Sequence, residues 1–136
     1  MKRTILAILA VLISCQAACA ANFVEVPYIS DVRIYLDMDS IVPEGDHVLS
    51  WLKLVPGTES IEGLRRAVHS DVSYVMQKTA FREGQEEYQI LEFAYYDADD
   101  NLLGKEEFPF AEDSYEKLPP TGYINQVYDE VMARDK

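Results

Sequence analysis

Apolar and polar residues alternate along most of the chain after residue 22, as they do in strands with one buried face. In the run 32–36, for example, Val32, Ile34 and Leu36 fall on one side. Turn-forming Asp, Asn, Gly and Pro residues separate the alternating runs. The pattern predicts strands at residues 23–26, 32–36, 47–54, 72–82, 86–96 and 102–108.

Two stretches depart from simple alternation. The apolar phase slips between Ile90 and Leu91, which predicts either a β-bulge or a strand covered on both faces. Residues 61–68 follow a Pro-Gly turn and predict no more than one irregular helical turn.

The hydrophobic period changes near the C-terminus. After a Pro-Pro pair, Thr121 can cap a helix, and Ile124, Val127, Tyr128 and Val131 then recur at helical spacing. A stripe one face wide is typical of a helix that lies on a sheet.

These elements together predict an α+β fold, in which an antiparallel β-sheet of five or six strands carries a C-terminal α-helix packed on one face. No internal repeat or linker interrupts the pattern, so residues 21–136 are expected to form a single domain.

The first twenty residues predict export. Lys2 and Arg3 precede a ten-residue apolar run, and Ala18-Cys19-Ala20 resembles a signal-peptide cleavage site. A run of that length spans about 15 Å as a helix, roughly half of a membrane core, which favours a signal peptide at residues 1–20 over a transmembrane anchor.

The segment ending at Cys15 (LISC) also resembles a bacterial lipobox, in which Cys15 would be lipidated. Both endings stay open, and both place the protein in the periplasm or at the cell surface. Membrane contact is expected only through such a lipid anchor.

Charge and cysteine content exclude several functions. The chain has 24 acidic against 12 basic residues, a net charge of −12, and such a surface repels nucleic acid. The two cysteines, Cys15 and Cys19, both precede residue 21, so the domain has no disulfide, zinc-thiolate site or cysteine nucleophile.

The sequence contains no convincing catalytic or metal site. His69-Ser70-Asp71 has the residue types of a hydrolase triad, but adjacent residues on an extended segment point to alternate faces. The acidic residues of 97–101 are ordinary turn residues and lack the glycine and distal glutamate of an EF-hand. We therefore expect no enzyme activity, no metal and no cofactor.

The order of local motifs resembles the surface-adhesin protein E family of exported bacterial proteins. The motifs are a tyrosine strand running into an Asp-x-x-Ser-Ile turn, a Trp-containing strand, a long hairpin, and a segment that opens the terminal helix. The matching segments are 34–41 (IYLDMDSI), 49–53 (LSWLK), 88–91 (YQIL), 96–101 (YDADDN) and 115–121 (YEKLPPT).

This resemblance implies an exported envelope protein. The adhesin activity of the best-known member involves host vitronectin and laminin, and no matching ligand motif is present in this chain. The chain also departs from the family in lacking the cysteine pair that members often carry between the hairpin and the terminal helix, and in having Tyr115 where a tryptophan is common.

Aromatic residues are the candidates for partner binding, because aromatic side chains are enriched at interface cores. The candidate residues are Tyr35, Trp51, Tyr95, Tyr96 and Tyr115. The function expected from the sequence is a non-enzymatic envelope or surface module that binds a protein partner, with a homodimer left open. The alternative is a periplasmic accessory domain that binds a small molecule or an envelope component.

Overall fold

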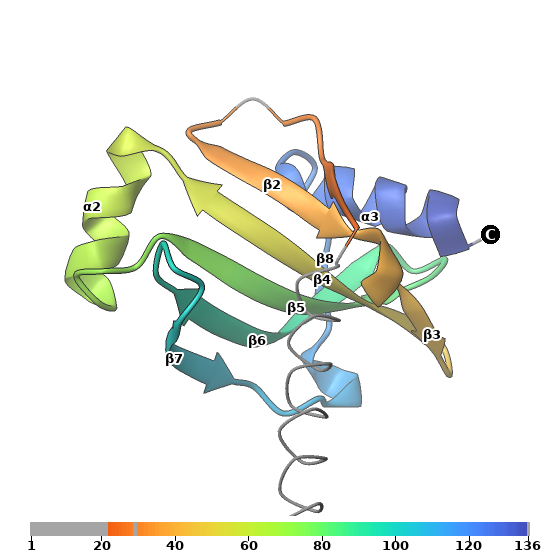
Figure 1. The fold of residues 1–136 in the computed structure, drawn as a ribbon. Helices are drawn as coiled ribbons and strands as arrows, with labels where there is room; N and C mark the ends of the chain where they lie inside the picture. The colour runs from red at the N-terminus through yellow and green to blue at the C-terminus, as the bar shows by residue number, and fades with distance from the viewer. Residues whose placement is uncertain (1–21, 29, 136) are drawn as a thin grey trace, which may run out of the picture.

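The computed structural model describes residues 22–28 and 30–135, and these form a strongly twisted antiparallel sheet with two α-helices (Figure 1). The strands are β1 (Phe23–Glu25), β2 (Val32–Asp37), β3 (Val42–Glu44), β4 (His47–Pro56), β5 (Tyr74–Arg82), β6 (Glu87–Tyr96), β7 (Leu102–Glu107) and β8 (Glu116–Lys117). The helices are α2 (Thr58–Ala67) and α3 (Tyr123–Asp135), with short 3-10 turns at Met38–Ser40 and Glu112–Ser114.

The sheet has eight strands, and six of them follow one path in the order β1-β2-β4-β5-β6-β7. The predicted α+β fold with an antiparallel sheet is confirmed. The two additional strands, β3 and β8, pair with β4 and β6 and are three and two residues long. Neither strand shows alternation in the sequence, because β3 consists of the turn-rich residues 42–44 with Pro43 and β8 has only two residues, so the predicted number of five or six was too low.

The long hairpin of β5 and β6 contains the predicted β-bulge. Lys78 lies opposite Glu92, whereas the next residue, Thr79, lies opposite Ile90. Leu91 is therefore the extra residue on β6. The phase slip seen in the sequence is the direct consequence of this bulge, because one inserted residue reverses the side on which later side chains point.

Helix α3 packs along one face of the sheet. Its residues Ile124, Val127 and Val131 are buried, with at most 4% of each exposed. They join a core cluster with strand residues of the same sheet face, namely Ile34, Leu36, Val48, Leu52 and Phe81. The predicted stripe and the predicted docking of the C-terminal helix are confirmed.

Helix α2 is longer than the irregular turn predicted from the sequence. It runs for ten residues from Thr58, and none of its residues is fully buried. Its start is held by a residue far away in the chain: Asp31 accepts hydrogen bonds from the amides of Gly57 (2.8 Å) and Ser60 (2.7 Å). A cap supplied from a distant loop leaves no local signal in the sequence.

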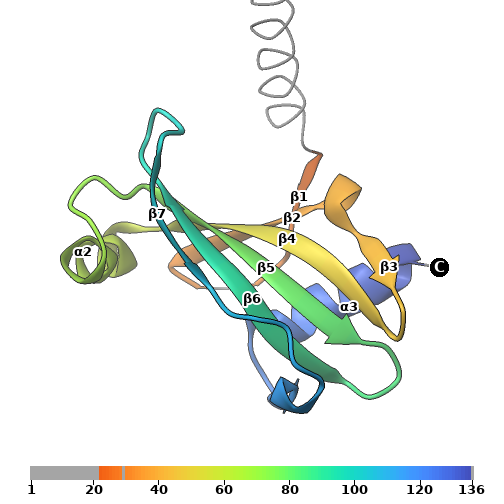
Figure 2. The same ribbon diagram turned by 90° about the horizontal axis from the view of Figure 1, so that it is seen from below.

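Both helices lie on the same face of the sheet. Leu52 and Leu54 point to the same side because they are two residues apart on β4. Leu52 belongs to the cluster under α3, and Leu54 contacts that cluster and also the one under α2. Figure 2 shows α2 at the left end of the twisted strands and α3 towards the right, partly hidden by the strands. We call this side the helix face and the other side the helix-free face.

None of the helices in the described part of the chain has both the length and the apolar character needed to cross a membrane.

Candidate functional site

The five aromatic residues predicted to bind a partner do not form one surface. Tyr35, Trp51 and Tyr96 lie on the helix-free face, whereas Tyr95 points to the helix face and Tyr115 lies between β7 and β8. Tyr95 and Tyr96 are adjacent in a strand, so their side chains leave on opposite sides. Tyr95 is only 8% exposed and is part of the core under α2, which removes it from a partner surface.

The helix-free face carries rows of directly opposed side chains. In one row, Tyr35 lies opposite Lys53, and Lys53 lies opposite Met76. In the neighbouring row, Trp51 lies opposite Lys78, and Lys78 lies opposite Glu92. Cross-strand neighbours of this kind stabilise one another across a sheet.

Lysines and aromatic rings interact on this face. The Lys53 ammonium lies 4.3 Å from the ring centroid of Tyr74 and 5.7 Å from that of Phe23. The Lys78 ammonium lies 5.9 Å from the Trp51 ring, a distance typical of a cation–π contact. Both lysines are half-buried.

Tyr74 and Tyr96 extend this arrangement towards the β6–β7 turn. Their rings stack with centroids 5.1 Å apart and 7° between the ring planes. The Tyr74 hydroxyl donates a hydrogen bond to Asp100 (2.7 Å). Burial and this hydrogen bond raise the pKa of Tyr74 above its ordinary value, so the hydroxyl stays protonated.

We call these residues the aromatic–lysine ladder. Its members share the helix-free face and are half-buried rather than covered by a helix. They are Tyr35, Trp51, Lys53, Tyr74, Lys78 and Tyr96.

Tyr115 is held by a different set of contacts at the far end of the helix-free face. The Arg82 guanidinium lies 4.0 Å from the Tyr115 ring centroid and pairs with Glu87 (3.3 Å) and Glu112 (2.8 Å). Burial raises the pKa of Tyr115. The segment 110–115 thus covers this end of the sheet, with Phe110 stacked on His47, and Tyr115 holds that segment through Arg82 rather than joining the ladder.

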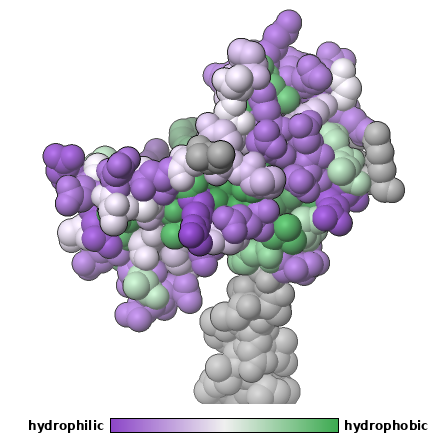
Figure 3. All heavy atoms as spheres, turned by 90° about the horizontal axis from the view of Figure 1, so that it is seen from above, coloured by the Kyte–Doolittle hydropathy of each residue, from purple (hydrophilic) through white to green (hydrophobic). Residues whose placement is uncertain are grey.

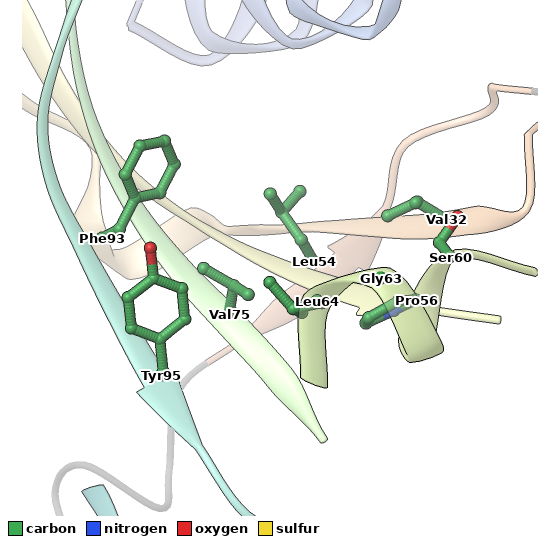
Figure 4. A pocket seen from close by; sticks show the side chains of 9 residues that line it. All are labelled: Val32, Leu54, Pro56, Ser60, Gly63, Leu64, Val75, Phe93 and Tyr95. Carbon is green, nitrogen blue, oxygen red and sulfur yellow. The ribbon is translucent and has the colours of Figure 1, made fainter. Parts of the chain in front are cut away.

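The helix face contains an apolar groove of about 480 Å³ between α2 and the strands (Figure 4). Figure 3 shows hydrophobic residues reaching the surface between α2, on the left, and the rest of the molecule. The groove is lined by Val32, Leu54, Pro56, Ser60, Gly63, Leu64, Val75, Phe93 and Tyr95.

Tyr95 closes one end of the groove. Its hydroxyl donates a hydrogen bond to Glu106 (2.9 Å). Burial, with this hydrogen bond, raises the pKa of Tyr95 to about 12. The hydroxyl is therefore protonated and already occupied at neutral pH.

The His69-Ser70-Asp71 segment forms a turn and not a proton relay. The Asp71 amide donates to Nδ1 of His69 (3.0 Å), so this ring nitrogen accepts a backbone hydrogen bond. The segment lies beside the 97–101 turn, and the two border a polar hollow of about 350 Å³.

In the 97–101 turn, the Asp97 carboxylate accepts hydrogen bonds from the amides of Asp99 (2.9 Å) and Asn101 (2.8 Å). Those bonds lower the pKa of Asp97. Within the described residues, no group of three or more His, Cys, Asp or Glu side chains is placed to hold a metal ion.

Sequence reasoning missed the lysines of the ladder and the groove. Lys53 stands two residues after Trp51 on β4, so alternation alone places both on one side. The groove had no such signal, because it depends on α2, whose cap comes from a distant loop. The predicted lipidation residue, Cys15, lies outside the described residues.

The chain was compared with known proteins by sequence and by structure. No family model, no curated protein and no solved structure matches it.

Proposed function

We propose that this chain is a non-enzymatic, exported envelope or surface module that binds a protein partner through the aromatic–lysine ladder. The observation that carries the proposal is the ladder itself, because it places aromatic rings and lysines side by side on the face that no helix covers. The resemblance to surface-adhesin E proteins agrees with this role and with an envelope location.

The chemistry of the ladder indicates the kind of partner. Lys53 and Lys78 contact aromatic rings, and neither forms an ion pair within the described residues. In a chain of net charge −12, they place two positive charges among the aromatic rings of this face. A partner that presents carboxylates next to apolar side chains is complementary to such a surface.

Site-specific photocrosslinking in the producing cell tests the face. A photoreactive phenylalanine analogue would replace Tyr35 on the ladder or, as a control, Asp129, which is exposed on α3. We expect a protein adduct from position 35 and none from position 129. Adducts of equal yield from both positions, or none from position 35, would overturn the proposal.

Charge reversal tests the chemistry. Lys53→Glu and Lys78→Glu are expected to abolish the adduct at position 35, whereas the same reversal at exposed Lys117 on β8 should leave it unchanged. Higher salt should also weaken capture, because exposed charge pairs are screened. An adduct at twice the mass of this chain would identify a second copy as the partner and would refute a distinct acidic protein.

A further inference from the structure

The groove on the helix face has walls of two kinds. Strands β2, β4, β5 and β6 provide one wall through Val32, Leu54, Val75 and Phe93, and α2 provides the other through Leu64 and Gly63 (Figure 4). It borders the small core cluster under α2, and Leu54 connects that cluster with the core under α3. The groove is therefore a gap in packing that is flanked by well-packed core.

The residues that line the groove provide few free hydrogen-bonding groups for a polar ligand. The Tyr95 hydroxyl already donates to Glu106, and the Ser60 amide already donates to Asp31. A peptide lying in the groove would bring an amide and a carbonyl with each residue, and few lining groups besides the Ser60 hydroxyl could pair with them, so most would lose water without gaining partners. A hydrocarbon chain has no such groups and loses nothing on entering.

Gly63 lies in the middle of α2 and faces the groove. Glycine is the least favourable helix residue after proline, so its place in a helix interior calls for a reason. Close packing is not the reason, because a Cβ built on Gly63 would meet no atom within 4 Å. Because Gly63 lines the groove, a side chain at this position would extend into its open space, and glycine leaves that space unfilled.

Charges near the groove restrict the head group of a ligand. The charged groups that hydrogen-bond to lining residues are both carboxylates, Asp31 at the Ser60 end and Glu106 at the Tyr95 end. An anionic head group at either end would be repelled. An uncharged or cationic head group is complementary to this rim.

We propose that the groove binds the aliphatic chain of a single-chain lipid whose head group is uncharged or cationic. This ligand site lies on the opposite side of the sheet from the ladder and is independent of the protein partner proposed above.

Calorimetric titration tests the proposal. The protein, expressed from its full sequence and processed by the cell, would be titrated with dodecyl maltoside, dodecyltrimethylammonium and laurate, each below its critical micelle concentration. We expect the uncharged and cationic amphiphiles to bind at least tenfold more tightly than laurate. No binding of any of the three, or equally tight binding of laurate, would overturn the proposal.

Two variants locate the binding. Gly63→Leu should fill the groove and lower the affinity for dodecyl maltoside at least tenfold. Glu62→Leu adds the same side chain at an exposed neighbouring position and should leave that affinity unchanged. If Gly63→Leu does not fold, Ser60→Leu narrows the same groove from the start of α2. Unchanged affinity in the folded groove variant, or an equal loss in Glu62→Leu, would refute the assignment.

The control for the other face is Lys53→Glu. Its amphiphile affinity should equal that of the unmodified protein, because Lys53 lies on the helix-free face. A loss of affinity in this variant would place the amphiphile on the ladder and overturn the groove site. If Lys53→Glu loses the partner adduct but still binds the amphiphile, the result supports both proposals.

Discussion

Two glycines near α2 are expected to respond in opposite directions to replacement by alanine. Gly57 stands at the N-cap of the helix and Gly63 lies in its interior. Gly57→Ala should lower the free energy of unfolding, whereas Gly63→Ala should raise it. The difference follows from what a Cβ atom meets at each position and not from backbone conformation, since φ of Gly57 is −85° and suits any residue.

The loss at Gly57 can be worked out from its contact with Asp31. A Cβ at Gly57 would lie 2.3 Å from Oδ1, 2.7 Å from the carbonyl oxygen and 2.9 Å from Cγ of Asp31. Asp31 must then move, which disrupts the hydrogen bonds it accepts from the amides of Gly57 and Ser60. A lost N-cap costs about 0.5–2 kcal/mol and a lost hydrogen bond about 0.5–1.5 kcal/mol. We expect Gly57→Ala to destabilise by about 2–3 kcal/mol.

The gain in stability expected from Gly63→Ala comes only from the higher helix propensity of alanine. A Cβ there meets nothing within 4 Å, so no clash opposes it. Alanine is favoured over glycine in a helix interior by about 0.8–1.0 kcal/mol, and we expect a stabilisation close to this value.

Urea unfolding followed by circular dichroism measures both changes, with Asp31→Ala as the third variant of a thermodynamic cycle. Gly57→Ala should cost less in the Asp31→Ala background, because two of the three close contacts involve the Asp31 side chain. A neutral or stabilising Gly57→Ala, or full additivity with Asp31→Ala, would show that Asp31 does not cap α2.

Three further predictions concern other parts of the chain. Val127→Asp should cost more than ~3 kcal/mol in a urea melt, since Val127 on α3 is fully buried against the sheet, whereas exposed Asp129→Ala should change stability by less than ~0.5 kcal/mol. Equal effects would mean that α3 is not docked through this stripe. The pKa of Tyr95 is raised to about 12, so the contribution of its protonated hydroxyl to the free energy of unfolding is complete below pH ~10 and declines as pH rises towards 12. Urea melts between these pH values should therefore show a smaller alkaline loss of stability in Tyr95→Phe than in the unmodified protein. An unchanged slope would contradict the burial of that hydroxyl. If Cys15 is lipidated, a palmitate analogue should label the protein and Cys15→Ala should abolish the label; an unlabelled protein starting at residue 21 would establish the soluble form.

Local periodicity was sufficient for the main features of the fold. Strand alternation and the helical stripe arise from side chains a few positions apart, so they can be recognised without knowing the partners of each element. Even the bulge at Leu91 was visible, because a single inserted residue reverses the phase of the apolar positions on one strand.

Features that depend on distant contacts were not predictable in the same way. Helix α2 begins where Asp31 caps it, 29 residues before Ser60. The aromatic candidates show the same limit: alternation predicts that Tyr95 and Tyr96 point to opposite sides, but not which side a helix covers. The contact of Tyr115 with Arg82 could not be predicted either, because it joins segments that are distant in sequence.

The division of the sheet into two faces separates stability from recognition. The buried core lies mostly on the helix face, where α3 contributes Ile124, Val127 and Val131. Half-buried ladder residues on the other face contribute less to that core, since an antiparallel sheet can leave one face to solvent. Lys53→Glu should therefore abolish partner capture while leaving the melting temperature almost unchanged, whereas Lys78→Glu places a second carboxylate opposite Glu92 and should lower the melting temperature slightly. A large loss of stability in either variant would mean that the ladder holds the sheet together, and its aromatic rings would then need no partner to explain them.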